Sequence, residues 1–395
     1  MSDIWEHDCV ISGIGISDIG RRTGIPGLML AETASREAIA DAGLTVADIG
    51  GITTRGEAPL DEVCDALGIE PVWTGEGGSG VGGVFGAVLD ACEAVAAGKA
   101  RHVLVYRSVA MLGGAMVPQA AGGPAPPPRP VRPRGVESPP AGELGGSGEL
   151  LAYHAYSASN WIGMHAQRHM HLYGTTKEQL GWLVVNSRRN AAFNPRAVYQ
   201  DPLTLDDYLA ARPISDPLGL LDCDAPIDGA IGIVVSHADY APDAPNLALK
   251  VNASARVSGA GGWTYRTDYP KMASVDAAAT LWSRTDLTVA DVDVAELYDG
   301  FSFLTLAWLE AHGICGDGES GPYVEGATRI ALDGELPLNT YGGQLSAGRM
   351  HGYWVLHEAC TQLRGDAGAR QVAHHEVALI STSGGPIATS MLLTR

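Results

Sequence analysis

The feature that most constrains the fold of this chain is an internal repeat. The segment LTVADI (44–49) recurs as LTVADV (287–292). In both places a helical pattern precedes the segment, and a strand, a glycine-rich turn, a long helix and a further strand follow it. Because the order of these elements also agrees, the sequence predicts a duplication. Two similar α/β halves of about 150 residues each fit a chain of 395 residues.

Hydrophobic spacing and glycine stops predict the elements of each half. The first half has the pattern of a strand at 9–15, a helix at 26–43, a strand at 50–54, a glycine-rich turn at 75–83, a helix at 84–97 and a strand at 101–106. The second half has a strand at 293–298, a turn at 341–352, a helix at 353–363 and a strand at 376–380. This alternation indicates a parallel or mixed sheet covered by helices.

The repeat also predicts the domain organisation. We expect an N-terminal half at 1–245 that contains an insertion at about 115–215, and a C-terminal half at 246–395. Within the insertion, 118–134 is rich in Pro and Gly and predicts an extended loop, and the segment that follows it has amphipathic helical patterns. Such insertions often cover an active site or form a subunit contact, and a surface excursion without a role is the alternative.

Charge and cysteine spacing exclude several classes of function. A formal net charge of −19 repels nucleic acid and anionic membranes. No apolar run is long enough to cross a bilayer, and the N-terminal residues lack the pattern of an export signal. The six cysteines lie far apart without C-x-x-C spacing, which argues against a structural zinc site and a disulfide framework. These features predict a cytoplasmic protein.

Gly78-x-Gly80-x-x-Gly83 matches the G-x-G-x-x-G pattern of a dinucleotide-binding turn. A dinucleotide site also needs an acidic residue after the next strand, and 107–111 contains none. Two alternatives remain: the glycines permit a tight turn into a helix, or their N–H groups stabilise an oxyanion.

His165, His169 and His171 have a spacing that can place metal ligands on one helical face. The Glu that follows the first His in metalloproteases is absent, so we interpret these residues as a solvated or interfacial histidine face. No metal is expected on this chain.

Polar side chains gather at three predicted turns that follow strands or precede helices. Tyr298 and Asp299 lie at the carboxyl end of the strand at 293–298, and the segment 339–354 contains Tyr341, Arg349, His351 and Tyr353. The turn at 381–386 adds Ser381, Ser383, Gly384 and Gly385. Asp299 also suits a helix N-cap, and each turn alone suits a structural role. In a duplicated fold the three turns can converge on one site at the carboxyl edge of the sheet.

At these segments the sequence resembles the thiolases of the sterol carrier protein x type, over nearly the whole chain. The specific matches are ELYDGFS (296–302), NTYGG (339–343) with GRMHG (348–352), QLRGDAGARQV (362–372) and the last Ser-Gly-Gly turn. The resemblance implies a five-layered αβαβα fold of two similar halves, with a lid-like insertion in the first. It also implies coenzyme A thioester substrates and a homodimeric core.

The catalytic residues of the family do not carry over. Gly77 occupies the position of the nucleophilic cysteine, Tyr298 and Arg349 those of two histidines, and Ser381 that of the late cysteine. Acyl transfer through a cysteine thioester is therefore excluded at this position. The resemblance leaves the glycine-rich turns as the expected binding site of the thioester oxygen, namely Gly77, Gly78, Ser79, Ser381, Ser383, Gly384 and Gly385.

One branch of this family consists of cysteine-less aldolases that cleave steroid side-chain CoA esters. The tyrosine at position 298 resembles that branch, which implies retro-aldol cleavage of a β-hydroxyacyl-CoA. It also implies a heterotetramer with a small zinc-ribbon/OB-fold partner of the DUF35 type, with zinc on the partner only. Coenzyme A is then part of the substrate, and no cofactor is expected on this chain.

The sequence allows more than one role for each catalytic candidate. Tyr298 suits either a proton acceptor beside Arg349 or a hydroxyl donor to the enolate. The second catalytic residue is Arg349, Tyr341 or Tyr353, with Asp299 and His351 as further candidates. The alternative functions are a non-catalytic acyl-CoA-binding subunit and a cysteine-independent condensing enzyme.

Overall fold

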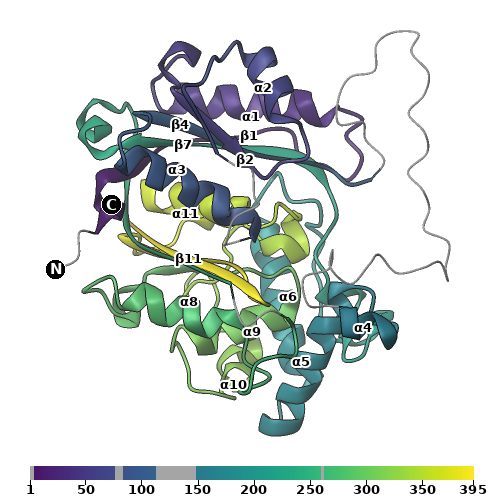
Figure 1. Cartoon of the computed structure of the whole chain (residues 1–395). Coiled ribbons are helices and arrows are strands. Elements are labelled where there is room, and N and C mark those ends of the chain that lie inside the picture. Colours follow the sequence, from purple (N-terminus) through teal and green to yellow (C-terminus); the bar gives the residue numbers. More distant parts are fainter. Residues whose placement is uncertain (1–3, 76–82, 113–147, 259–261) are drawn as a thin grey trace, which may run out of the picture.

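The computed structural model describes residues 4–75, 83–112, 148–258 and 262–395 (Figure 1). The proline-rich segment 118–134 lies outside the described residues, as do Gly77, Gly78 and Ser79.

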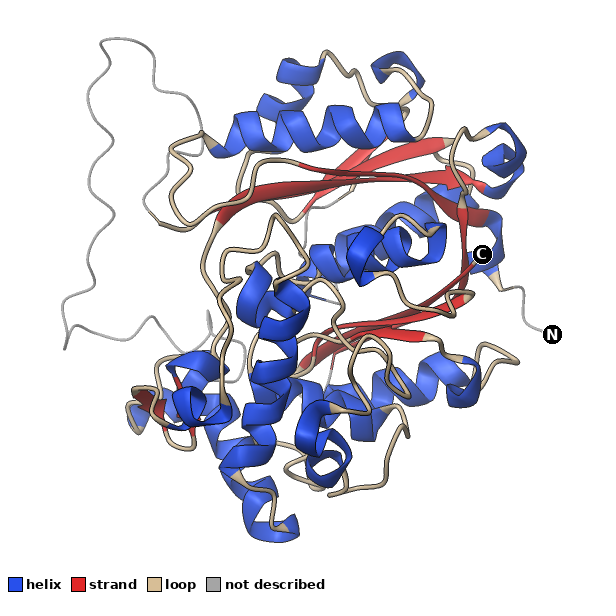
Figure 2. Cartoon of the chain, turned by 180° about the vertical axis from the view of Figure 1, so that it is seen from behind, coloured by secondary structure: helices blue, strands red, loops and turns tan. Residues whose placement is uncertain are grey.

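Nine of the described strands form one sheet in the order β3-β2-β4-β7-β1-β8-β11-β10-β9. In chain order they are β1 (Cys9–Ile16), β2 (Gly51–Thr54), β3 (Trp73–Thr74), β4 (His102–Ala110), β7 (Asp228–His237), β8 (Leu249–Ser258), β9 (Val294–Glu296), β10 (Val377–Ser383) and β11 (Ile387–Thr394). The pairs Val10–Lys250 and Ile11–Leu249 join β1 to β8. This short junction lets the two ends of the sheet turn toward each other (Figure 2).

Helices form three layers around and between the two parts of the sheet (Figures 1 and 2). The outer helices are α1 (Gly27–Asp41) and α2 (Leu60–Leu67) on one side, and α8 (Ala273–Trp282), α9 (Ser302–Ala311) and α10 (Ser320–Val324) on the other. Between the parts lie α3 (Gly86–Ala96) and α11 (Tyr353–Arg364). This is the five-layered αβαβα arrangement that the resemblance implies.

Helix α11 forms the centre of the core. Nearly all its side chains are buried, as expected of a helix that contacts strands on both sides. It contacts β9 and β10 in one half and β1 and β7 in the other. The glycine-rich turn at 341–352 precedes it, so this turn lies close to the interface of the two halves.

The two copies of the repeat have the same local structure. Each forms a short 3-10 turn, Val46–Asp48 or Val289–Asp291, with a capping box made by Thr and Asp. The Asp Oδ2 accepts from the Thr N–H at 2.8 Å in the first copy and 2.7 Å in the second. The following strands, β2 and β9, pair in parallel with β4 and β10. The boundary between 245 and 246 lies between β7 and β8 and stays a prediction.

The structure corrects the predicted extents of some elements. Strands β4 and β10 extend to Ala110 and Ser383, four and three residues beyond the predicted ends at 106 and 380, because β7 and β11 pair with their full lengths. Part of the predicted turn at 341–352 is a π-helical turn, Gly343–Ala347. Asp299 caps this turn, as described below.

The helices of the insertion pack against the C-terminal half. They are α4 (Gly148–Ala152), α5 (Ala158–Tyr173), α6 (Lys177–Ala191) and α7 (Leu205–Leu209), followed by a hairpin of β5 (Pro213–Ser215) and β6 (Leu218–Gly219). Helix α6 contacts α9, α10 and the turn at 343–347, so the insertion supports the segment that carries several candidate residues (Figure 1). None of the helices that the structure describes has the length and apolar character required to cross a membrane.

Candidate functional site

Tyr298 lies directly after β9, in the loop that leads to α9. Its backbone N–H donates a hydrogen bond to Oγ of Ser381 in β10 at 3.3 Å. Gly300 leaves room for the ring, because a Cβ at position 300 would lie 2.6 Å from Cε1 of Tyr298. Tyr298 is partly exposed. The loop therefore holds the phenol at the carboxyl edge of β9, where α/β proteins bind ligands.

Asp299 caps the π-helical turn at 343–347 rather than α9. Its carboxylate accepts hydrogen bonds from the N–H groups of Gln344 at 2.8 Å and Leu345 at 3.3 Å. The side chain is 1% exposed, and burial raises the pKa of its carboxyl to about 7 against these hydrogen bonds. Both oxygens are engaged with the backbone, so Asp299 positions the turn.

Gln344 lies in the turn that Asp299 caps, and it connects this turn to His351 and to the segment of Ala225. Its Oε1 accepts the N–H of His351 at 2.9 Å, and its carbonyl accepts the N–H of Ala225 at 2.9 Å. Its Nε2 is buried and makes no hydrogen bond of ordinary geometry in the described part of the chain. The Gln344 side chain nevertheless lies beside Tyr298 and Asp299, because its hydrogen bonding lowers the pKa of both groups.

Arg349 forms an ion pair with Asp224, with Nη1 3.2 Å from Oδ1. The backbone N–H of Arg349 also donates to the carbonyl of Ala225 at 2.8 Å, so both main chain and side chain fix the pair. Burial raises the pKa of Asp224 to about 7, Arg349 lowers it, and Asp299 raises it further. The side chains of Asp224 and Arg349 are 8% and 34% exposed, which leaves the pair open to a ligand.

The phenol of Tyr298 is neutral at physiological pH. Burial raises its pKa, the charge of Asp224 raises it further, and Arg349 opposes both effects without overcoming them. A neutral phenol donates a hydrogen bond and does not accept a proton from an alcohol. The structure therefore favours the donor over the acceptor among the two roles predicted for Tyr298.

The imidazole of His351 is also neutral, and Arg107 contacts its Nδ1 atom. The residue has φ +51°, and its Nδ1 lies 3.0 Å from Nη2 of Arg107 in β4. Burial and the charges of Arg107 and Arg349 lower the pKa of His351 to about 3. The lone pair on Nδ1 faces an arginine donor, so this atom is not free to accept a proton.

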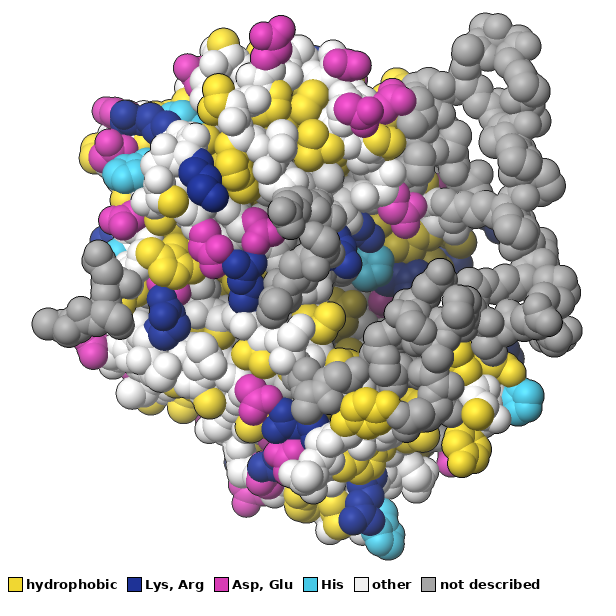
Figure 3. All heavy atoms as spheres, viewed as in Figure 1, with side chains coloured by type: hydrophobic (Ala, Val, Ile, Leu, Met, Phe, Trp, Pro, Cys, Tyr) yellow, Lys and Arg dark blue, Asp and Glu magenta, His cyan; other side chains and the backbone are white. Residues whose placement is uncertain are grey.

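Arginine side chains give this site a positive charge. Arg107 is 6% exposed, donates through Nη1 to the carbonyl of Arg55, and has no partner for Nε in the described residues. Nη1 of Arg55 is likewise buried without a described partner. Figure 3 shows basic, histidine and acidic side chains together in a hollow between the two halves of the molecule. Such cations stabilise a negative charge that develops on an oxygen atom.

Tyr341 and Tyr353, two of the predicted catalytic residues, lie in the core. Both are 0% exposed. The ring of Tyr341 stacks on Trp354 with centroids 5.3 Å apart, and that of Tyr353 meets Phe85 edge-on at 6.1 Å. Burial raises the pKa of both phenols. The structure does not place these two phenols on the partly exposed surface with Tyr298 and Arg349, and their catalytic roles stay predictions.

The turn formed by Ser383, Gly384 and Gly385 lies close to the start of α3. A Cβ on Gly83, in the 3-10 turn Gly83–Phe85, would lie 3.1 Å from Oγ of Ser383. Gly384 has φ +117°, and a Cβ there would lie 2.9 Å from Nε1 of Trp308. The predicted thioester-binding role of this turn, of Ser381, and of the undescribed Gly77, Gly78 and Ser79 stays a prediction.

Two histidines of α5, His165 and His169, have structural roles, and the prediction of a solvated or interfacial face is wrong for them. His165 is buried between the carbonyls of Pro270 and Trp263, each 2.8 Å from a ring nitrogen. His169 is buried beside Glu310 at 3.0 Å, and only His171 is exposed. No cluster of three or more potential metal ligands occurs in the described part of the chain.

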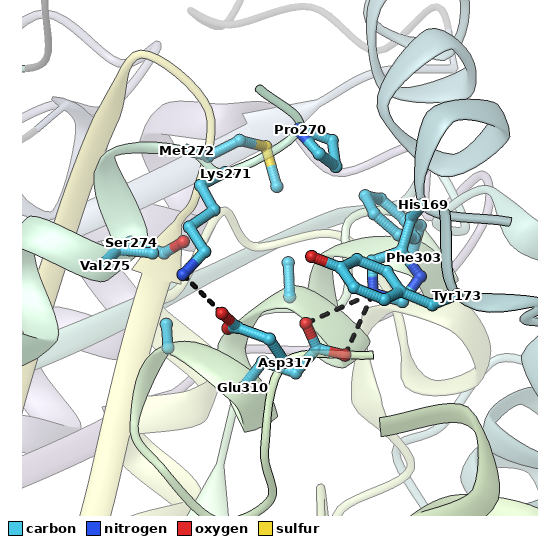
Figure 4. Close-up of a pocket in the computed structure, with 12 residues that line it drawn as sticks. His169, Tyr173, Pro270, Lys271, Met272, Ser274, Val275, Phe303, Glu310 and Asp317 are labelled. Atoms are coloured by element: carbon cyan, nitrogen blue, oxygen red, sulfur yellow. Dashed lines mark hydrogen bonds and ion pairs between the residues drawn. The ribbon is translucent and has the colours of Figure 1, made fainter. Parts of the chain in front are cut away.

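The pocket beside His169 is too small for a coenzyme A ester. It has a volume of about 30 Å³, enough for a water molecule. Figure 4 shows His169 directed at Glu310, and Lys271 directed at Asp317 across the same pocket. The first pair joins α5 to α9, and the second joins the segment before α8 to the loop between α9 and α10, so both have a structural role.

The cysteines give no support for a thiolate nucleophile at this site. All six cysteines are described and none forms a disulfide. Cys223 lies next to Asp224 in sequence, but its thiol points to the carbonyl of Gly219 at 3.5 Å. Burial raises the pKa of this thiol to about 12, so it is not a thiolate at neutral pH.

Asp224, Gln344 and Arg107 belong to the site but carry no motif that predicts it from the sequence. Asp224 lies in an irregular segment between the 3-10 turn Leu220–Asp222 and β7, more than 70 residues before Tyr298. Arg107 is the charged residue in the strand sequence HVLVYRSVA (102–110), whose other residues are apolar or uncharged. A charge in such a place is the signal that could have identified it, since buried charges are uncommon without a function or a partner.

Residues 259–394 match the family model described as thiolase C-terminal domain-like. The chain is 36% identical over 396 residues to the 17-hydroxy-3-oxo-4-pregnene-20-carboxyl-CoA lyase of Mycobacterium tuberculosis, covering 97% of this chain and 98% of the relative. It is 34% identical over 366 residues to the steroid side-chain-cleaving aldolase of Thermomonospora curvata, covering 90% of each chain.

Among solved structures, the chain is similar to the one titled Ltp2-ChsH2(DUF35) aldolase. The TM-score is 0.87 at 30% identity, and the match covers 99% of each chain. A monomeric SCP2-thiolase-like protein of Mycobacterium smegmatis matches with a TM-score of 0.72 at 16% identity, over 98% of this chain and 78% of that one. The second match supports the fold alone.

Proposed function

Because this chain belongs to the thiolase-like family that includes the steroid side-chain-cleaving aldolases, we propose that it cleaves a β-hydroxyacyl-CoA by a retro-aldol reaction. We propose that the acyl group of this substrate is the side chain of a steroid, with the CoA thioester at its end. The substrate named for the Mycobacterium tuberculosis relative has a hydroxyl at position 17 and the CoA thioester on position 20. Its hydroxyl carbon is therefore β to the thioester carbonyl, as retro-aldol cleavage requires.

The observation that supports this proposal is the ion pair of Arg349 and Asp224 beside the neutral phenol of Tyr298. Retro-aldol cleavage needs an acceptor for the hydroxyl proton and donors for the developing enolate oxygen. It needs no covalent nucleophile. The site offers a carboxylate and several cationic donors, and the thiol of Cys223 is neutral.

Each group can take a defined part in the reaction. The phenol of Tyr298 donates a hydrogen bond to an oxygen of the substrate and orients it. The guanidinium groups of Arg107 and Arg349 stabilise the negative charge that moves to the thioester oxygen when the Cα–Cβ bond breaks. One donor aimed at such an oxygen contributes about 2.7–4 kcal/mol of transition-state stabilisation. Asp299 contributes indirectly, because it holds the turn that carries Gln344 and Arg349.

We propose that the active form is an assembly with a small DUF35-type protein, as in the solved structure titled Ltp2-ChsH2(DUF35) aldolase. In this proposal zinc belongs to the partner, this chain carries no cofactor, and two copies of each chain form a heterotetramer. Co-expression with a DUF35 protein encoded nearby, followed by mass measurement of the purified complex by light scattering, tests the assembly. A chain that elutes alone contradicts it.

The activity is tested with 17-hydroxy-3-oxo-4-pregnene-20-carboxyl-CoA, incubated with the chain alone and with its partner. We expect release of a steroid 17-ketone and a three-carbon acyl-CoA in equal amounts, detected by liquid chromatography and mass spectrometry. A short-chain β-hydroxyacyl-CoA in a parallel reaction tests the steroid preference. Binding of the substrate without cleavage in either preparation contradicts the proposed activity and supports a non-catalytic acyl-CoA-binding subunit.

A further inference from the structure

The proposed reaction needs a proton acceptor, and the predicted candidates do not provide one. The phenol of Tyr298 is neutral. Nδ1 of His351 faces a guanidinium donor of Arg107. Both oxygens of Asp299 accept backbone hydrogen bonds, and the side chain is closed to a ligand at 1% exposure. The acceptor must therefore be another group at the same site.

The fold holds Asp224 between the two turns that carry Tyr298 and Arg349. Its N–H donates to the carbonyl of Gly300 at 3.2 Å, two residues after Tyr298. The next residue, Ala225, donates to the carbonyl of Gln344 at 2.9 Å and accepts from the N–H of Arg349 at 2.8 Å. Three backbone hydrogen bonds thus fix the carboxylate beside both residues.

The carboxylate of Asp224 is only partly engaged. Oδ1 pairs with Arg349, and no donor among the described residues bonds to Oδ2. The groups with the largest charge effects on it are Arg349, which favours the carboxylate, and Asp299, which favours the acid. The resulting pKa of about 7 suits a general base, because a base with a pKa near the working pH combines availability with basicity.

Asp222, two residues earlier, shows what a structural carboxylate looks like in the same segment. It is 0% exposed. Its Oδ1 accepts from the hydroxyls of Tyr208 and Ser302 at 2.6 Å each, and its Oδ2 accepts from the N–H of Gly219 and from Lys177. Every acceptor position that it needs is filled by the protein, whereas Asp224 keeps one oxygen for a ligand.

We propose that Asp224 is the general base that removes the proton from the β-hydroxyl of the substrate. This inference rests on the proposed retro-aldol function. Asp224 takes the proton, the oxygen lone pair forms the new ketone C=O bond, and the Cα–Cβ bond breaks. The electron pair of that bond moves to the thioester as an enolate. The proton held by Asp224 then returns to Cα, which gives the shorter acyl-CoA and regenerates the carboxylate.

The test compares wild type with Asp224→Asn and Asp224→Ala, each assembled with the partner. Asp239→Asn is the matched control, because it removes one carboxylate from an exposed ion pair with Arg101. The measurements are kcat/KM between pH 5 and 9, the Kd of the substrate, and the rescue of Asp224→Ala by formate. Exchange of the Cα protons of the short acyl-CoA product in D₂O isolates the second proton transfer.

Wild type and Asp239→Asn should share an acid limb in kcat/KM with an apparent pKa near 7. Asp224→Asn should lose about 100-fold or more of the activity, the acid limb and the Cα exchange, while its Kd changes less than about threefold. Formate should restore part of the activity of Asp224→Ala. If wild type cleaves and Asp224→Asn keeps its rate and acid limb, Asp224 is not the base. If wild type does not cleave the substrate, the proposed function is wrong, and the role of Asp224 as its general base is wrong as well.

Discussion

Replacement of Gly343 by alanine should damage the scaffold of the site in a way that can be calculated from the structure. Gly343 has φ +62°, a left-handed conformation that costs about 1–2 kcal/mol for a residue with a Cβ. A Cβ there would overlap Oδ2 of Asp299 and lie 2.9 Å from its Cγ. Asp299 would have to move and lose at least one charged hydrogen bond to Gln344 or Leu345, at about 1.5–3 kcal/mol.

The two effects together predict a destabilisation of about 2.5–5 kcal/mol for Gly343→Ala. Gly313→Ala is the matched control. Gly313 has φ +73° but no atom within 4 Å of its virtual Cβ, so only the backbone strain of about 1–2 kcal/mol applies. Urea unfolding followed by tryptophan fluorescence measures both variants, and the cleavage assay measures the loss of activity. Equal destabilisation of the two variants would refute the clash with Asp299.

Three further predictions concern single side chains. Tyr298→Phe should lower kcat about 10²–10³-fold with little change in substrate Kd, measured by single-turnover kinetics, because it removes one hydrogen-bond donor. Arg349→Met should move the acid limb of kcat/KM to higher pH, because Arg349 lowers the pKa of Asp224; an unchanged limb contradicts this coupling. Although burial raises the pKa of Glu310, the hydrogen bond and charge of His169 hold it below 4.5. Glu310→Gln should therefore lower the melting temperature at pH 7, and the difference from wild type should vanish as the pH falls below about 4.

The repeat could be predicted from the sequence because local hydrogen bonds determine it. Thr45 with Asp48, and Thr288 with Asp291, form the same capping box within four consecutive residues. The helices and strands could be predicted for the same reason, because apolar spacing and glycine stops are local patterns. The ends of β4 and β10 could not be predicted in this way, because they are determined by pairing with β7 and β11.

The base could not be predicted, because long-range contacts create it. Asp224 pairs directly with Arg349, 125 positions later in the chain. Backbone hydrogen bonds to Gly300 and Gln344, 76 and 120 positions later, hold its segment there, the second made by its neighbour Ala225. The same limit applies to His165, whose helical spacing predicted a solvated or interfacial face. Its partners are the carbonyls of Trp263 and Pro270, about 100 residues away. Sequence spacing identifies residues on the same face of a helix, but it does not identify the groups that this face contacts.

In the proposed reaction this site breaks a carbon–carbon bond without a covalent intermediate. Mass spectrometry of the intact protein during turnover of the β-hydroxyacyl-CoA, with both products quantified in the same samples, is the decisive test of this reaction. We expect the ketone and the shorter acyl-CoA to form in equal amounts while the mass of the chain stays unchanged. An acyl adduct on the chain that forms and decays at the rate of turnover would contradict the account.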